Sequence, residues 1–245
     1  MSDIALSPEE RMRIAETWNF RYDAERTAIL RFERLTRALR KTEAAPQVIE
    51  LAHQAVEDEK RHAILCKEIA LEFGFPYGKT DTEVEALPLA PPNFTRRDAV
   101  LYEVVAFCCI TETINTTMLV DTLEFAKDAR IRDAVRTILR DEINHSRLGW
   151  AHLTHETALG RGGFFPDTLL GMFSQIGIEE ILERTGTRET NALAYYGELN
   201  DERRISLFRG AVYELVLPGL ESAGVDTQDL RTWLEHRGVA PDADS

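Results

Sequence analysis

The 245-residue sequence has few cysteines, glycines, prolines and basic residues. Its three cysteines, Cys66, Cys108 and Cys109, are an odd number placed in apolar runs, which indicates a reducing compartment without disulfides. Fourteen glycines and nine prolines are too few for a turn-rich all-β chain of this length. An apolar fraction of 44% nevertheless predicts a well-packed core, so these shortages favour a helical protein.

Lysine and arginine number 29 against 42 acidic residues, which gives a formal charge of −13. Such a surface repels phosphate groups, and we expect no nucleic-acid partner. The first twenty residues lack an apolar segment flanked by positive charge, so no signal peptide is predicted. No run of 18 apolar residues is present, and we therefore expect no membrane span and a cytoplasmic location.

Helix-start and helix-stop signals divide the first two thirds of the chain into four long helices. Ser7 followed by Pro8 and Glu10 forms a capping box, Thr95 and Asp128 are further N-cap residues, and Gly74 is a natural helix end. The predicted helices cover about 8–41, 46–73, 96–126 and 129–159. At 1.5 Å per residue these helices are about 42–51 Å long.

The connections between these helices predict their arrangement. Short links join the first helix to the second and the third to the fourth, which favours two antiparallel hairpins. Between the hairpins, residues 74–95 contain four prolines and can stretch to about 70 Å, enough to run back along a bundle. We predict a four-helix bundle over 1–163 with one long crossover.

Residues 164–245 are predicted to form a helical extension packed on the bundle, with short helices near 167–184, 188–199, 201–217 and 226–236. We expect this extension to shape a pocket at one end of the bundle.

Two copies of the pattern D-E-x-x-H stand in the second and fourth predicted helices. They are Asp58-Glu59-Lys-Arg-His62 and Asp141-Glu142-Ile-Asn-His145. Glu and His three positions apart share a helix face, so both side chains can reach one metal ion. A single E-x-x-H carries little information, and Glu50-x-x-His53 also fits it on the opposite face of its helix. Two copies that each include the preceding Asp are unexpected by chance.

A dinuclear carboxylate site needs one further Glu from each partner helix. Glu112 is the only charged residue in an apolar run, and burying it is costly unless it is paired or bound to metal. Counted from the connecting loop, Glu112 and Glu142 lie within about 1.5 Å of the same level. In the first helix, Glu25 misses the level of Glu59 by about 4.5 Å and Glu33 by about 7.5 Å, so we choose Glu25.

The predicted metal ligands are therefore four glutamates and two histidines: Glu25, Glu59, His62, Glu112, Glu142 and His145. Oxygen and imidazole nitrogen suit Fe(II) or Mn(II), and a structural zinc site is disfavoured because no cysteine belongs to the set. The alternative is a metal-free bundle with two carboxylate–imidazole ion pairs, which leaves buried negative charge uncompensated. Ligating imidazoles usually donate their second N–H to a carboxylate, so we expect Asp58 to face His145 and Asp141 to face His62.

On these residues the chain resembles the ferritin-like di-iron carboxylate proteins, over about 15–158 as a fold. It is more closely similar to a bacterial ferritin-like oxidase or oxygenase subgroup in the segments that begin at Glu25, Asp58 and Asp141. The resemblance implies that Glu25 and His62 hold one iron, that Glu112 and His145 hold the other, and that Glu59 and Glu142 bridge them. It further implies a di-iron oxidoreductase that uses O2 as co-substrate to oxidise a small organic molecule.

Other features of the family narrow this expectation. Ile138 stands where some N-oxygenases have a third histidine ligand, and no C-x-x-C iron domain of the rubrerythrin type is present, so an external electron donor is implied. Tyr22 and His152 are further candidates for roles beside the metals, although ordinary packing also explains both. The alternative functions are a ferroxidase or iron-handling protein and a metal-free interaction bundle. The sequence leaves the substrate, the reaction type and a homodimer open.

Overall fold

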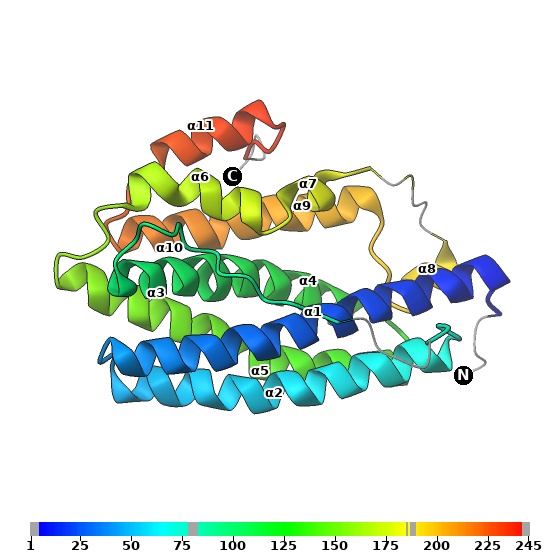
Figure 1. Cartoon of the computed structure of the whole chain (residues 1–245). Helices are drawn as coiled ribbons and strands as arrows, with labels where there is room; N and C mark the ends of the chain where they lie inside the picture. Colours follow the sequence, from blue (N-terminus) through cyan, green and yellow to red (C-terminus); the bar gives the residue numbers. More distant parts are fainter. Residues whose placement is uncertain (1–4, 78–82, 185, 187–189, 242–245) are drawn as a thin grey trace.

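The computed structural model describes residues 5–77, 83–184, 186 and 190–241, and this part of the chain is helical and contains no strand. The first three bundle positions are filled by α1 (Pro8–Lys41), α2 (Pro46–Glu72) and α5 (Ala129–Ala158). The fourth is one long helix built from α3 (Arg96–Val104), the π-helix η1 (Val105–Thr111) and α4 (Glu112–Phe125). Figure 1 shows these helices lying side by side along one direction, and the all-α prediction is confirmed.

The helix boundaries follow from capping chemistry. Ser7 accepts the Glu10 N–H while the Glu10 carboxylate accepts the Ser7 N–H, which completes the capping box of α1. The Thr95 and Asp128 side chains cap α3 and α5 by accepting the N–H groups of Asp98 and Ile131. Each cap satisfies backbone donors that have no partner within the helix.

The crossover runs back along α1 and is held there by partly buried charged groups. Glu103 on α3 accepts the Leu89 N–H at 2.7 Å and pairs with Arg34 of α1 at 3.0 Å. Arg34 also donates to the carbonyl groups of Ala86 and Leu87. Three chain segments are thereby joined, which lets the second hairpin pack against the first.

After the bundle the chain forms several short helices and one continuous helix over 201–222, which is longer than the helix predicted over 201–217. The elements are α6 (Phe165–Gln175), α7 (Ile178–Leu182), α8 (Asn191–Tyr195), α9 (Asp201–Gly210), η2 (Ala211–Val216), α10 (Leu217–Ser222) and α11 (Gln228–His236), and the continuous helix is made of α9, η2 and α10. The single helix predicted over 167–184 is wrong because Gly177 adopts a left-handed conformation with φ 75° and separates α6 from α7. Of the helix predicted over 188–199, residues 188–189 lie outside the described residues and only Asn191–Tyr195 is helical.

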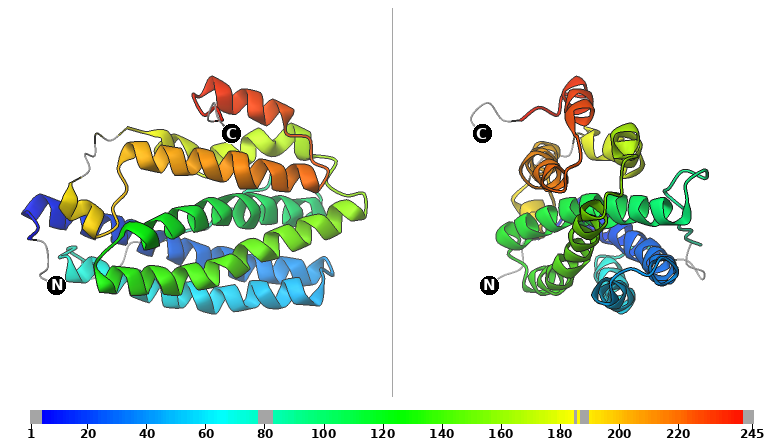
Figure 2. Two further views of the ribbon diagram at one scale, coloured as in Figure 1. Left: turned by 180° about the vertical axis from the view of Figure 1, so that it is seen from behind. Right: turned by 90° about the vertical axis from the view of Figure 1, so that its left-hand side faces the viewer.

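At the end of the bundle where α4 leads into α5, residues of the extension line a cavity of about 250 Å³: Tyr195 and Arg203 face Phe125 and Lys127 there. Most of the extension, however, is not placed at an end of the bundle. In the left view of Figure 2, α8 lies beside the N-terminal part of α1, whereas α6, α9, η2 and α10 lie along the bundle on the side of α3, η1 and α4. The reason is the apolar face of that long helix, where Leu101, Val105 and Cys109 pack in one cluster with residues such as Phe208 and Leu220. By length and composition alone the stretch Arg96–Phe125 could cross a membrane, but 61% of its most apolar window is buried inside the protein, as in a core helix.

Candidate metal centre

Six buried side chains from four helices meet in the middle of the bundle. Each is no more than 7% exposed. Their ligand atoms form two groups, Glu25, Glu59, His62 and Glu142 in the first and Glu59, Glu112, Glu142 and His145 in the second. Within each group the ligand atoms lie within 4.8 Å of one another, and Glu59 and Glu142 belong to both. This is the geometry of two adjacent metal positions with two shared carboxylates.

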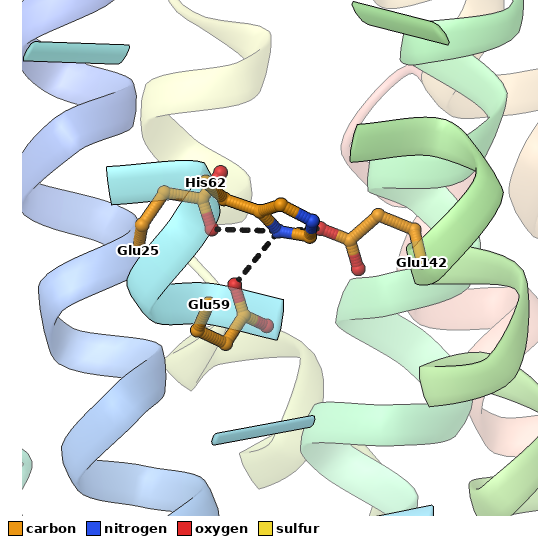
Figure 3. A group of neighbouring side chains, drawn as sticks. All are labelled: Glu25, Glu59, His62 and Glu142. Carbon is orange, nitrogen blue, oxygen red and sulfur yellow. Dashed lines mark hydrogen bonds and ion pairs between the residues drawn. The ribbon is translucent and has the colours of Figure 1, made fainter. Parts of the chain in front are cut away.

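The first group is centred on the Nδ1 atom of His62 (Figure 3). This nitrogen lies 3.2 Å from Glu59, 3.8 Å from Glu142 and 3.9 Å from Glu25. Glu25 reaches in from α1, whereas Glu59 and His62 project from successive turns of α2, as Figure 3 shows. The level mismatch of about 4.5 Å estimated for Glu25 is thus bridged by its side chain.

The second group is centred on the Nδ1 atom of His145. This nitrogen lies 2.9 Å from Glu142 and 3.1 Å from Glu59. Asn115, one helical turn after Glu112, donates its side-chain amide to Glu142 at 3.4 Å. The ring of Phe32 is completely buried and packs against the His145 ring with centroids 5.0 Å apart. An apolar wall therefore closes this side of the cluster.

The π-helix η1 and a glycine of α5 bring Glu112 to its position. In η1 the Thr111 hydroxyl donates to the carbonyl five residues earlier, at Ala106, at 3.0 Å. Such wider turns shift the phase of the residues that follow and occur at functional sites. Facing η1, Gly149 lies so close that a Cβ there would be 2.8 Å from the backbone of Cys108. Glu112 follows η1 directly, so this close approach sets its distance from α5.

The second nitrogens of the two histidines point away from the cluster. His62 Nε2 lies 3.4 Å from Asp141, and His145 Nε2 lies 3.4 Å from Asp58. Each aspartate therefore faces the histidine of the other helix, in the arrangement expected from the sequence. A carboxylate at Nε2 favours the tautomer with the proton on Nε2, which leaves the Nδ1 lone pair directed at the ligand group.

Burial dominates the electrostatics of the glutamates. It raises the pKa of Glu25 and Glu112 well above the ordinary value, and their carboxylate neighbours, Glu59 for Glu25 and Glu142 for Glu112, raise it further. Glu142 behaves differently: burial is again the largest effect, but the hydrogen bond and charge of His145, with a hydrogen bond from Glu112, together outweigh burial and lower its pKa. Burial opposes the charged form of His145, but contacts with Asp58 and Glu142 raise its pKa well above 6.5. Four carboxylates thus share a water-poor site with only two imidazoles to balance them.

Comparison with protein families places this site in context. The family model described as rubrerythrin matches residues 20–150, a segment that contains all six clustered side chains. The chain belongs to the rubrerythrin family. No curated protein and no solved structure matches the chain. The family is part of the ferritin-like di-iron superfamily, and the helices that follow α5 lie outside the matched residues.

The donor set fits the metal pair that this family implies. Oxygen-rich sites with imidazole nitrogen suit Fe(II) and Mn(II). Two divalent ions would supply four positive charges to four buried carboxylates, whose desolvation is otherwise unfavourable. A rubrerythrin-type domain and a buried carboxylate–histidine cluster together fit a di-iron site.

Several sequence candidates lie elsewhere. The Tyr22 hydroxyl accepts a hydrogen bond from Lys67 at 3.3 Å, so its polar end is engaged by a lysine. His152 is buried seven residues after His145, about 10 Å along α5, and interacts electrostatically with Glu156. Glu50 and His53 are exposed, as the opposite helix face predicts. Burial raises the pKa of the Cys66 and Cys108 thiols well above 9, so both behave as small apolar residues.

Sequence reasoning missed Arg61 and Phe32. Arg61 contacts both Asp58 and Asp141, and its spacing of three residues from Asp58 was the available signal. Phe32 gave no signal, because an aromatic residue seven positions after Glu25 is common on the core-facing side of a helix.

The described structure has one cavity of about 250 Å³ beside Tyr195 and Arg203 and another of about 280 Å³ beside Glu68 and Asp133. Neither cavity is lined by any of the six clustered side chains.

Proposed function

We propose that this chain is an O2-dependent di-iron oxidoreductase that oxidises a small organic substrate. The observation that carries the proposal is the pair of overlapping four-residue groups that share Glu59 and Glu142. In this assignment Glu25 and His62 hold one iron, and Glu112 and His145 hold the other. An iron pair held there would supply two electrons to O2 together, without release of a one-electron product. Mn(II) is the alternative metal because the same ligands suit it.

The protein's own groups would hold and orient the pair. Glu59 and Glu142 each approach both histidine Nδ1 atoms, so each carboxylate can link the two positions. Asn115 restrains Glu142 from the side of α4, and the two aspartates fix the imidazole rings. Such outer hydrogen bonds orient ligands and tune the metals that they hold.

The surroundings of the second group are apolar. Phe32 and Phe107 pack with ring centroids 4.9 Å apart, and Cys108 beside them is fully buried. An apolar wall of this kind excludes water from the reacting groups. Because the 245 residues contain no C-x-x-C pair that could hold a further iron, the proposal includes an external electron donor. The proposed setting is the reducing cytoplasm.

An anaerobic Fe(II) titration followed by rapid mixing with O2 tests this proposal. We expect saturation at two Fe(II) per chain, followed by a transient visible absorption when O2 is added. Sustained O2 consumption should then require an electron donor and increase when the organic substrate is present. Saturation at fewer than two irons per chain, with no reaction of the bound iron with O2, would refute it.

A ferroxidase or iron-handling role is the second candidate. It is favoured because the two cavities described above lie away from the cluster, and Fe(II) needs less space than an organic substrate. In that case O2 consumption should follow added Fe(II) alone, and the oxidised iron should leave the site or accumulate beyond two per chain. Stable retention of two irons through several reaction cycles would argue against this role.

A further inference from the structure

We propose that Arg61 is a positioning residue that orients both histidines and thereby sets the affinity of both metal positions. The proposal rests on the metal centre proposed above. The Arg61 guanidinium contacts Asp58 on its own helix and Asp141 on α5, the latter at 3.1 Å. Each of these aspartates in turn lies 3.4 Å from one histidine Nε2. A single side chain is thus two contacts away from both imidazole rings.

The connections cross between the helices. Asp58 on α2 faces His145 on α5, whereas Asp141 on α5 faces His62 on α2. Arg61 spans the same two helices, so one guanidinium joins both contacts and also fixes the spacing of α2 and α5. If it is removed, both aspartates lose a partner at the same time, and both imidazole rings lose a restraint.

Charge gives the second reason for a shared arginine. Asp58 and Asp141 are 2% and 7% exposed, and both contact the Arg61 guanidinium. Two neighbouring buried carboxylates repel each other unless a cation lies between them. Arg61 supplies that cation, and a planar guanidinium can donate to two carboxylates at once, which an ammonium group does less well.

Arg140 provides a natural comparison. Its Nε donates to the other oxygen of Asp141 at 3.1 Å, and 71% of its side chain is exposed. The structure shows no contact between Arg140 and Asp58. Loss of Arg140 should therefore disturb only the His62 position, whereas loss of Arg61 should disturb both positions.

Co(II) titration of the apo-protein under anaerobic conditions tests the proposal, because Co(II) reports its ligand geometry by visible absorption. We expect Arg61→Gln to weaken both Co(II) sites by about 10-fold to 100-fold and to alter the absorption of both. Arg61→Lys should restore part of the affinity, and Arg140→Gln should weaken only one site. Lys60→Gln is the matched control, because Lys60 is exposed and pairs with Glu57 outside the centre.

The outcomes separate the two proposals. If Arg61→Gln binds two Co(II) with the affinity and spectrum of the unaltered chain, or if Arg140→Gln weakens both sites equally, the role given to Arg61 is wrong. If the unaltered chain fails to bind two metal ions, the metal centre itself is wrong and the role of Arg61 falls with it. Circular dichroism of each variant checks that it is folded, which is expected because half of the Arg61 side chain is exposed.

Discussion

Replacing Gly149 by alanine should separate the two helices that carry Glu112 and Glu142. A Cβ at this position would lie 2.8 Å from the backbone carbon and the Cβ of Cys108 and 2.9 Å from the Cys109 nitrogen. Ordinary van der Waals contact begins at 3.4 Å, so α5 and η1 have to move apart by about 0.6 Å. The contacts are mainly with backbone, which cannot turn aside as a long side chain can.

Two opposing effects decide the stability of this variant. Alanine is favoured over glycine inside a helix by about 1 kcal/mol. Overpacking of a closely packed interior costs about 1–3 kcal/mol, and contacts with backbone belong at the upper end of that range. We therefore expect a net loss of about 1–2 kcal/mol in the free energy of unfolding. The same movement should weaken the metal position of Glu112 and His145.

Urea denaturation of the metal-free variant measures the first effect, and Co(II) titration measures the second. Gly171→Ala is the matched control, because Gly171 is an exposed residue within α6 whose added Cβ would meet only the Tyr102 hydroxyl, at 3.5 Å. That variant should be as stable as the unaltered chain or more stable. The reasoning fails if Gly149→Ala unfolds at the same urea concentration as the unaltered chain and binds both metal ions normally.

Two further predictions concern buried ionisable groups. Glu112→Ala should reduce Fe(II) binding from two ions per chain to one, whereas Glu33→Ala, outside the cluster, should retain two; retention of two in Glu112→Ala would contradict the ligand assignment. Burial lowers the pKa of His152 to about 4, although Glu156 opposes this change. Neutral His152 therefore stabilises the fold fully above pH 6.5, and this contribution, about 3 kcal/mol, should be lost as the pH falls towards 4. His152→Gln should lack this part of the pH dependence in urea denaturation, and an identical pH dependence in both proteins would show that His152 does not titrate in this way.

Much of the helical framework can be predicted from local sequence. The caps at Ser7, Thr95 and Asp128 act within a few residues, so they mark helix starts without any knowledge of the fold. The repeated D-E-x-x-H pattern works in the same way, because helix geometry alone places Glu and His on one face. The choice of Glu25 over Glu33 came from counting residues along the helix. That count showed which of the two lies nearer the level of Glu59, but not that either side chain reaches the site.

The tertiary structure decided what depends on packing between distant segments. The π-helix η1 has no local signal, and it occurs where Gly149 of α5 allows a close approach to Cys108. The place of the C-terminal helices depends on the apolar face of α3, η1 and α4, so their position along the bundle could not be predicted from their own sequence. Arg61 is an exposed charge in its own helix and becomes a link between two histidines only when α5 brings Asp141 to it. Ligand identity is thus encoded by helical spacing, whereas the contacts that orient the ligands arise from helix packing, because they join residues about 80 positions apart.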